Sequence, residues 1–363
     1  MVTILAGLAF LSVYALICLY IGVNFWSWLK TTFSFKYKKT YIIIVSLLSL
    51  AFFGGYSIPS PLLEMIGGYW LVVIGYSILI LPIINIIYFI LKKNRKWKIG
   101  LGWVTVAFFA FVFIYGSYNA WTPVVREYDV SIDKTIANDK KELKILMAAD
   151  LHLGTVIGNN HLDKLVKIVN DVKPDIIFLP GDIINDDITP YVEQEMRTTM
   201  EKIQAPLGVF AVPGNHDYYG GHNEKLKKEL EEIDIRFLMD EAVEVAGDFL
   251  VLGRDDFTNP NRKTLDELIN KLDKSKPIFV LDHQPREIIE AQAEGADMIF
   301  SGHTHRGQLA PAHLITERMY DNDWGYLNIQ QLHSFTTSGF GLWGPALRIG
   351  SQSEVMVIDV TFN

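Results

Sequence analysis

Four apolar stretches within the first 121 residues constrain the fold of this 363-residue chain more than any other feature. They lie at about residues 2–29, 41–58, 69–91 and 99–121. Each is near the ~20 residues that a helix needs to cross the hydrocarbon core of a bilayer. Glu64 is the only acidic residue of the whole segment. We therefore predict that residues 1–121 form an all-α transmembrane anchor of four helices, and that residues 122–363 form a second domain.

A signal peptide followed by a buried core is the competing interpretation of these stretches. It fits less well, because Met1-Val2-Thr3 has no basic n-region and because four such stretches exceed an ordinary core. Three or five crossings stay open as alternatives, since prolines blur the helix boundaries at Pro59, Pro61 and Pro82. No ionisable residue lies deep inside a predicted crossing, which favours an anchor over a transport pathway.

The charge of the connecting loops predicts the orientation of the helices. Basic residues in the first and third connections are Lys30, Lys36, Lys38, Lys39, Lys92, Lys93, Arg95, Lys96 and Lys98. The second connection, at about residues 57–68, has no Lys or Arg. Because short basic loops stay on the cytoplasmic side, both termini and the domain at 122–363 are predicted to be extracytoplasmic. The membrane would be a bacterial plasma membrane.

The remaining composition limits the partners of residues 122–363. They hold 24 of the 33 basic residues and 40 of the 41 acidic residues, a formal balance of about −16. We expect no nucleic acid partner, because no basic stripe is available for phosphate contacts. The only cysteine, Cys18, falls in the first crossing, so the second domain is expected to fold without a disulfide.

Short apolar runs alternate with helical patterns along the second domain. The runs lie at residues 144–149, 175–179, 207–212, 277–281 and 297–300, with a closing run at 354–360. The helical patterns lie at about residues 159–172, 190–204, 222–233, 263–272 and 285–293. Continuous apolar runs of this length predict strands that are buried on both faces. The alternation predicts an α/β domain.

A polar motif follows each of the first five runs. The motifs are Asp150-x-His152, Gly181-Asp182, Gly214-Asn215-His216-Asp217, His283 and Gly302-His303-x-His305. Ligand sites in open α/β sheets lie at the carboxyl ends of strands, and an extended chain points alternate side chains to one face. Carboxylates and imidazoles together suit a pair of divalent first-row metals. Two such metals side by side are suited to phosphoester hydrolysis, because one oxygen is activated between them.

In these motifs the chain resembles the calcineurin-like metallophosphoesterase superfamily. The signature of that superfamily is D-x-H, G-D, G-N-H-D/E, H and G-H-x-H, and the match spans about residues 144–305. The stretch at residues 338–350, with Glu354, is similar to the closing loop of the membrane-anchored, YkuE-like branch. That branch includes transmembrane proteins with a metallophosphoesterase domain. The resemblance implies a two-sheet β-sandwich flanked by helices.

The resemblance also implies a role for each motif residue. The first metal would be held by Asp150, His152 and His305, the second by Asn215, His283 and His303, and both by Asp182. The metals would be two divalent ions from among Mn, Zn, Fe, Co, Ni and Mg, with the attacking hydroxide between them. His216 would donate a hydrogen bond to the phosphoryl oxygen or protonate the leaving group, and Asp217 would orient its ring.

Three further residues are candidates for substrate binding. Arg306 stands where the branch usually has glycine; it could grip a second phosphate or a carboxylate, or pair with an acidic residue at the surface. His222 follows Gly220-Gly221 and could line the pocket. Arg348 is interpreted first as fixing its loop and second as binding substrate. Aromatic residues of the same loop could pack beneath it or contact an acyl chain.

Together these features predict a membrane-anchored phosphoesterase with two metals, acting on a phosphomonoester or phosphodiester. A lipid-linked phosphate is one candidate substrate, because tethering gains little for a freely diffusing ester. Two alternatives remain. One is a UDP-diacylglucosamine-type pyrophosphatase, which an outward-facing domain fits poorly because such nucleotide-linked substrates are cytosolic. The other is a metal-binding sensor or scaffold without catalysis, which would not need His216.

Overall fold

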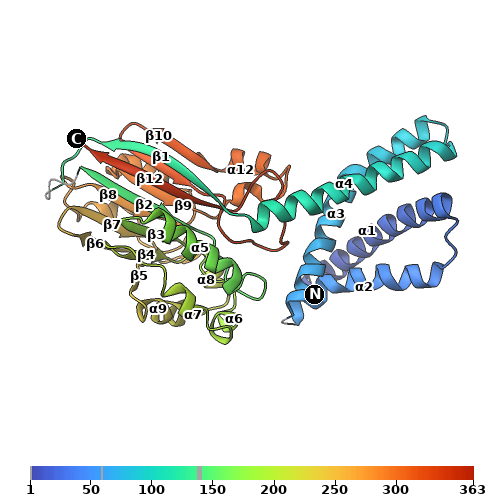
Figure 1. Ribbon diagram of the computed structural model, residues 1–363, viewed down its shortest axis with the longest axis horizontal. Coiled ribbons are helices and arrows are strands. Elements are labelled where there is room, and N and C mark those ends of the chain that lie inside the picture. Colours follow the sequence, from blue (N-terminus) through green and yellow to red (C-terminus); the bar gives the residue numbers. More distant parts are fainter. Residues whose placement is uncertain (1, 59, 137–140) are drawn as a thin grey trace. The chain divides into compact units, whose positions relative to one another are not determined.

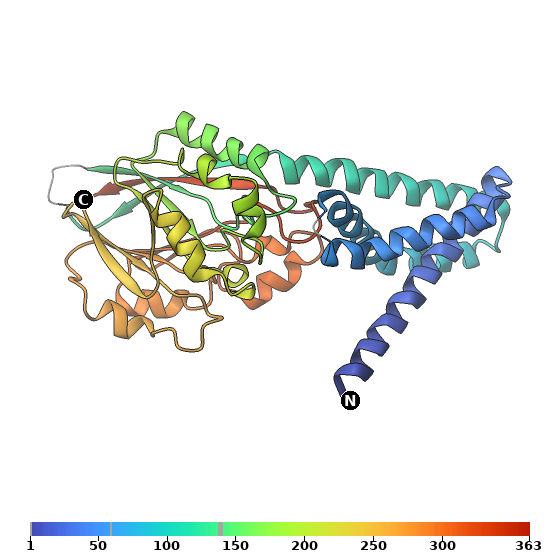
Figure 2. The same cartoon turned by 90° about the horizontal axis from the view of Figure 1, so that it is seen from below.

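The computed structural model describes residues 2–58, 60–136 and 141–363, and the chain forms two compact units. The first unit is Met1–Gly116 with Gly344–Ala346. The second is Ser117–Trp343 with Leu347–Asn363. Figures 1 and 2 show long helices in the first unit, and sheets with flanking helices in the second.

The first unit consists mainly of four long helices. They are α1 (Val2–Phe33), α2 (Lys38–Ser57), α3 (Pro61–Ile90) and α4 (Arg95–Trp121), whose last residues belong to the second unit. All four are long and apolar enough to cross a membrane, and the four predicted apolar helices are thus confirmed. Pro61 begins α3, Pro82 lies inside it, and Pro59 is outside the described residues.

Close packing between α1 and α4 depends on a glycine. The Trp28 indole lies against Gly102, so that a Cβ added at Gly102 would stand 1.9 Å from Cδ1 of the ring. The indole N–H also donates to the carbonyl of Ile99 on α4 at 3.3 Å. A small residue at this position therefore lets the two helices approach each other.

We expect Gly102→Ala to destabilise the first unit by about 1–3 kcal/mol, because the added methyl group overlaps the Trp28 ring. Thermal unfolding of the full-length protein in detergent measures the effect. Gly100→Ala is the matched control, since its Cβ would meet nothing within 4 Å and alanine favours the helix. Equal losses from the two substitutions would contradict the packing argument.

The second unit contains two six-stranded mixed sheets. The first, in order, is β1 (Val124–Ile132), β12 (Glu354–Phe362), β2 (Glu142–Met147), β3 (Ile176–Pro180), β4 (Val209–Val212) and β5 (Ile235–Phe237). The second is β10 (Gly325–Ile329), β11 (Leu332–Thr336), β9 (Met298–Ser301), β8 (Ile278–Leu281), β7 (Phe249–Gly253) and β6 (Glu241–Val245). The predicted two-sheet fold flanked by helices is confirmed.

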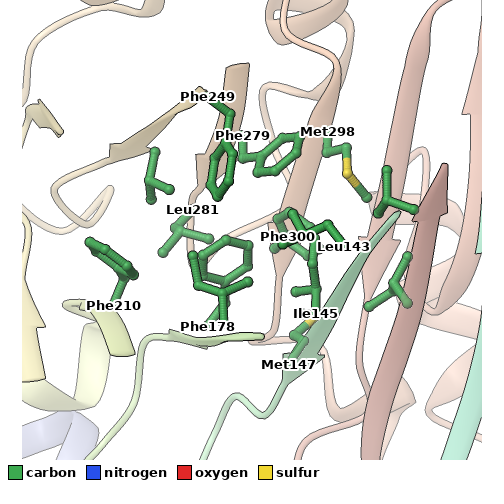
Figure 3. Packing of buried hydrophobic residues seen from close by; sticks show 14 of the residues in the cluster. Leu143, Ile145, Met147, Phe178, Phe210, Phe249, Phe279, Leu281, Met298 and Phe300 are labelled. Carbon is green, nitrogen blue, oxygen red and sulfur yellow. The ribbon is translucent and has the colours of Figure 1, made fainter. Parts of the chain in front are cut away.

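Aromatic side chains fill the space between the two sheets (Figure 3). Phe178 of the first sheet meets Phe300 of the second, with ring centroids 4.9 Å apart, and Phe279 and Phe249 extend the cluster. β3, β4, β8 and β9 are buried along their whole length. This agrees with their prediction from continuous apolar runs.

Helices cover the sheets and connect successive strands. The helices of the first half are α5 (Asn159–Val172), α6 (Thr189–Glu193), α7 (Met196–Met200), α8 (Asn215–Tyr219) and α9 (Asn223–Glu231). Those of the second half are α10 (Leu265–Ile269), α11 (Ile288–Glu294), the short 3₁₀ turn η1 (His305–Gly307) and α12 (His313–Met319). α10 and α11 pack on the second sheet through an apolar cluster that includes Leu268 and Ile288.

Candidate metal centre

The five motifs all lie at one edge of the sandwich, which we call the site edge: the edge where β2, β3, β4, β8 and β9 end. Asp150 follows β2, Asp182 follows β3, Asn215 begins α8 after β4, His283 follows β8, and His303 follows β9. The two sheets contribute to a single cluster, because the amide of His303 donates to Asp150 Oδ1 at 2.9 Å. The strand-end rule therefore brings residues from both sheets together.

The backbone is left-handed at five of the seven candidate ligands. The φ angles of Asp150, His152, Asp182, His303 and His305 are 54°, 46°, 51°, 71° and 47°. Positive φ is uncommon in residues other than glycine and gathers at functional sites. The expectation of an extended Asp150-x-His152 segment is therefore wrong. The amides of Asp150 and His152 instead donate to the carbonyls of Gly181 and Asp182, each at 3.0 Å.

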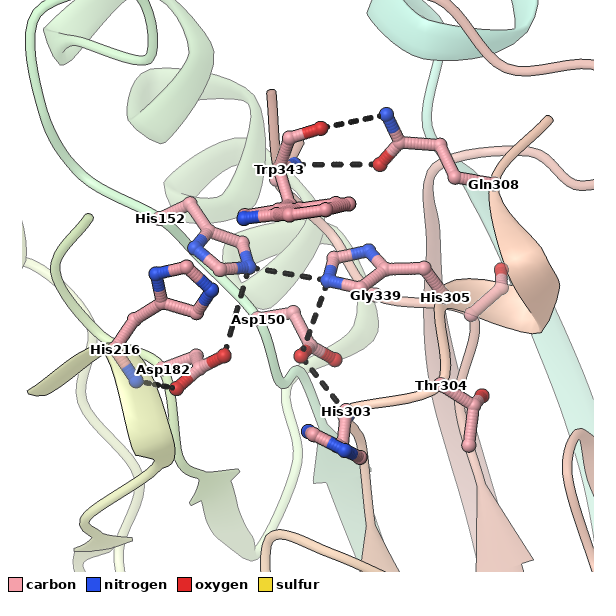
Figure 4. Close-up of polar contacts among 12 residues, drawn as sticks. Asp150, His152, Asp182, His216, His303, Thr304, His305, Gln308, Gly339 and Trp343 are labelled. Carbon is pink, nitrogen blue, oxygen red and sulfur yellow. Dashed lines mark hydrogen bonds and ion pairs between the residues drawn. The ribbon is translucent and has the colours of Figure 1, made fainter. Parts of the chain in front are cut away.

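Asp150, His152 and His305 form the first candidate group of ligands. One ligand atom from each lies within 4.8 Å of the others. The Nε2 atoms of His152 and His305 face each other at 3.1 Å, and His305 Nε2 lies 3.5 Å from Asp150 Oδ1 (Figure 4). Among the residues that the structure describes, Asp150 Oδ2 has no hydrogen-bond partner although it is buried. Lone pairs that converge in this way fit a cation.

Asn215, His283 and His303 form the second group. Asn215 Oδ1 lies 2.8 Å from His303 Nδ1 and 3.2 Å from His283 Nε2. His283 Nδ1 lies 2.9 Å from the carbonyl of Pro180. A proton on Nδ1 would satisfy that carbonyl and would leave the Nε2 lone pair directed into the site, as metal-binding histidines require.

Asp182 lies between the two groups. Its Oδ2 atom is 3.2 Å from His283 Nε2 and 3.7 Å from His152 Nε2. Its Oδ1 atom accepts the His216 amide at 2.8 Å, which fixes the carboxylate (Figure 4). A carboxylate in this position could bridge two cations.

Burial dominates the electrostatics of several candidate ligands, but not of Asp182 and His283. Burial opposes the charged form of both, yet the attraction between their opposite charges holds the pKa of Asp182 below and that of His283 well above the usual values. Burial lowers the pKa of His152 to about 3 and holds the pKa of His305 well below its usual value. Both imidazoles are therefore neutral at pH 7, the form that binds metals. Burial, together with the negative charge of Asp182, raises the pKa of Asp150 to about 7. A nearby cation would favour the ionised carboxylate, so the donor set fits a pair of divalent metals.

Two motif glycines allow the backbone to approach the carboxylates. A Cβ at Gly214 would stand 2.1 Å from Asp182 Oδ1, and one at Gly302 would stand 2.4 Å from Asp150 Oδ2. Real Cβ atoms do not make such contacts, so any larger residue would displace a candidate ligand.

His216 faces the first group, and its ring contacts Asp186. The centroids of the His216 and His152 rings are 4.8 Å apart, and His216 Nδ1 lies 2.7 Å from Asp186 Oδ1. Burial opposes protonation of His216, but the hydrogen bond to Asp186 and the negative charges of Asp182 and Asp186 together outweigh it and raise the pKa of the imidazole. The ring could therefore carry a proton into the site.

The expectation that Asp217 orients the His216 ring is wrong. Its carboxylate is fully buried and accepts the amides of Ile183, Ile184 and Gly214 at 3.2, 2.9 and 2.8 Å. Asp217 thus ties α8 to the segment after β3, and Asp186 contacts the ring instead. The sequence Asn185-Asp186-Asp187 reads as an acidic surface turn, so nothing in the spacing indicated Asp186.

The three candidate substrate residues have different surroundings. The Arg306 guanidinium stacks on the Trp324 ring, with its carbon 3.8 Å from the ring centroid. His222 is partly exposed, and its Nε2 lies 3.6 Å from Asp187 Oδ1. Substrate binding by either residue remains a prediction.

Arg348 is fully buried and holds the closing loop, which we define as residues 338–350. Its guanidinium donates to the carbonyls of Ser338, Gly339 and Gly341 at 2.6, 3.1 and 2.7 Å. One nitrogen lies 3.3 Å from His305 Nδ1. These contacts favour the loop-fixing interpretation of Arg348 over substrate binding.

Glu354 holds the start of the same loop. Its buried carboxylate accepts the Ser338 amide at 2.8 Å, the Thr337 hydroxyl at 3.0 Å and the Trp324 indole N–H at 2.9 Å. It also pairs with Arg126. The Trp324 indole that supports Arg306 is thus itself fixed by Glu354.

The comparisons with known proteins agree with this site. The family model of calcineurin-like phosphoesterases matches residues 143–307. An uncharacterised metallophosphoesterase of Aquifex aeolicus is 30% identical over 245 residues, which cover 65% of this chain and 91% of that protein. One of Campylobacter jejuni is 31% identical over 254 residues, 68% of this chain and 66% of that protein. The match therefore spans just under two thirds of this second relative.

A transmembrane protein with a metallophosphoesterase domain from Danio rerio is 27% identical over 262 residues, 67% of this chain and 58% of that protein. The chain belongs to the calcineurin-like phosphoesterase family, and the resemblance seen in its five motifs is confirmed.

We expect Asp182→Ala and Asn215→Ala to differ in metal content. Asp182 lies between both groups, so its removal should lower the occupancy of both metals; Asn215 contacts only the second group. Elemental analysis of the purified protein should give about two metals per chain for the wild type, about one for Asn215→Ala and fewer for Asp182→Ala. Equal loss in both variants would contradict the bridging position.

We expect Arg348→Met to lower metal content although Arg348 is not a candidate ligand, because three buried carbonyls lose their donor and the contact with His305 is lost. Metal titration should show affinity reduced by about 10–100-fold, as for other outer-shell changes. Arg236→Met, at an exposed arginine on β5, is the control. A wild-type affinity in Arg348→Met would show that the loop does not support the site.

Proposed function

We propose that the second domain hydrolyses a phosphomonoester or phosphodiester with two divalent metals. The observation that carries the proposal is the position of Asp182 Oδ2, between His283 Nε2 at 3.2 Å and His152 Nε2 at 3.7 Å. The seven ligands in the proposal are Asp150, His152, Asp182, Asn215, His283, His303 and His305. Family membership supports the reaction class.

Bound metals would acidify a water held between them and neutralise charge on the phosphoryl oxygens. The chain itself supplies the proton. His216, with its pKa raised beside Asp186, would donate from Nε2 to the phosphoryl oxygen or to the leaving oxygen. Asp186 would hold the ring in place through Nδ1 and stabilise its charged form.

The pair of His216 and Asp186 also favours an enzyme over a metal-binding sensor. The ring faces the first ligand group, with its centroid 4.8 Å from that of His152, but it is not needed in the seven-ligand set. A protein that only binds metal has no use for a protonated imidazole at this position. A reaction that must protonate a leaving oxygen requires such a proton donor.

We further propose that the four helices anchor the chain in a bacterial plasma membrane, with the catalytic domain on the extracytoplasmic side. The basic first and third loops support this orientation. The substrate would be an ester linked to a membrane lipid. A UDP-diacylglucosamine-type pyrophosphate fits this orientation poorly, because it would be cytosolic.

The proposed activity is tested with bis-p-nitrophenyl phosphate and p-nitrophenyl phosphate. The full-length protein is stripped of metal and then restored with Mn, Zn, Fe, Co, Ni or Mg. We expect release of p-nitrophenol to require metal, to fall ~10²–10⁴-fold in His216→Ala, and to fall by about 10–100-fold in Asp186→Asn. Metal content should be unchanged in both variants.

His333→Ala, on β11, is the control for loss of a histidine outside the site. Full turnover by His216→Ala with metal bound would refute its role as proton donor. Metal bound without hydrolysis of either ester, or of esters in lipid extracts, would favour the sensor.

A further inference from the structure

The first strand of the second unit, β1, begins at the site edge. α4 ends at Trp121, and β1 begins at Val124. β1 runs parallel to β12, and β12 runs antiparallel to β2, so β1 begins where β2 ends. Neighbouring strands lie about 4.8 Å apart, which puts the start of β1 about 10 Å from the line of β2.

Hydrogen bonds join the last turn of α4 to the segments around the ligands. The carbonyl of Asn119 accepts the amide of Ser353 at 3.0 Å, and the Asn119 side chain donates to the carbonyl of Arg348 at 3.2 Å. Arg348 in turn holds the closing loop beside His305. The point where the chain leaves α4 is therefore part of the site edge.

This connection limits where the site edge can be. Three residue steps, from Trp121 to Val124, span at most about 11 Å even when fully extended. If α4 crosses a bilayer, as its length and apolar composition allow, the start of β1 stays within about 11 Å of the end of that helix. The connection therefore keeps this end of the site edge near the lipid surface.

Exposed apolar side chains gather at the same edge. Ten large apolar side chains beyond Trp121 are exposed among the described residues, and five of them lie in α8, in α12 or in the closing loop. The five are Tyr219, Leu314, Ile315, Met319 and Trp343. Such side chains are favourable at a membrane interface and unfavourable in water.

α12 is the clearest case, because none of its residues is buried. Ile315 and Met319 are 61% and 62% exposed, and they stand four residues apart, on one face of the helix. The chain reaches α12 directly from His305, through η1. In the sequence, α12 thus begins eight residues after the candidate ligand His305.

Two aromatic side chains extend this surface to His216. The His216 ring lies 5.2 Å from that of Tyr219 and 6.2 Å from that of Trp343, centroid to centroid. Tyr219 and Trp343 are 61% and 53% exposed. Figure 4 shows the Trp343 indole beside His152 and His305. Tyrosine and tryptophan are the residues that prefer the headgroup level of a membrane.

We propose that the site edge lies in the headgroup layer of the bilayer, inserted through Ile315, Met319 and Trp343, and that the substrate is an amphiphile taken directly from the membrane. The occupant is lipid rather than a second protein, because the short link to α4 already holds this surface at the bilayer. The substrate part of the proposal rests on the proposed phosphoesterase activity; the lipid contact does not.

Lipid contact is tested by an experiment that does not measure hydrolysis. Cys18 is the only cysteine, so Cys18→Ala allows a nitroxide label to be attached at a single introduced cysteine, Ile315→Cys. In full-length protein in phosphatidylcholine vesicles, we expect the label to relax faster with oxygen, which enters lipid, than with a nickel chelate, which stays in water. A label at Val192→Cys, at an exposed residue of α6, is the aqueous control.

A label at Ile315→Cys that is as accessible to the nickel chelate as the one at Val192→Cys would overturn the proposal. So would a label at Ile315→Cys shielded from both reagents, because that result indicates protein contact, with a second copy for example.

Substrate access is tested with two diesters of the same leaving group. Hexadecyl p-nitrophenyl phosphate is diluted into the vesicles, and bis-p-nitrophenyl phosphate is supplied in water. We expect the double substitution Ile315→Asp and Met319→Asp to lower hydrolysis of the vesicle substrate at least tenfold and to change that of the soluble one less than twofold. Val192→Asp should change neither.

The two esters separate the possible failures. If the wild-type protein hydrolyses neither ester, the proposed function is refuted, and the label test alone decides whether the site edge contacts lipid. Hydrolysis of both esters at wild-type rates by the double variant Ile315→Asp and Met319→Asp would refute entry of the substrate from the membrane.

Discussion

The Asp182 carboxylate connects the parts of the molecule on which the candidate site depends. Its Oδ1 accepts the amide of His216, at the start of α8 after β4, and its Oδ2 faces His283, which follows β8 of the other sheet. Its backbone carbonyl accepts the amide of His152 after β2. One residue thus aligns three strand ends from two sheets. The aromatic core beneath, with Phe178 against Phe300, fixes the distance between those sheets.

The sequence was sufficient to predict the elements that carry the motifs. Continuous apolar runs predict buried strands. The bounds of β3, β8 and β9 fall within one residue of the runs at 175–179, 277–281 and 297–300. Other elements lack such a signal. β5 has three residues, one of them the exposed Arg236. The helix predicted at 190–204 is broken in two, because Glu195 adopts a left-handed conformation.

Parts of the site itself could not be predicted, because they depend on contacts between distant residues. The neighbour in sequence of His216 is Asp217, but the backbone amides after β3 occupy its carboxylate and Asp186 reaches the ring. The role of Arg348 likewise depends on the course of the closing loop, whose carbonyls converge on one guanidinium. Spacing along the chain carries no information about such convergence.

The left-handed backbone at Asp150, His152, Asp182, His303 and His305 has a consequence for the stability of the domain. A left-handed conformation costs a residue other than glycine about 1–3 kcal/mol. Amide–carbonyl hydrogen bonds at Asp150 and His152, and the apolar core on which the strand ends rest, help to offset that cost. A substitution that loosens this core would therefore also disturb the ligand loops, although it touches no residue of the site.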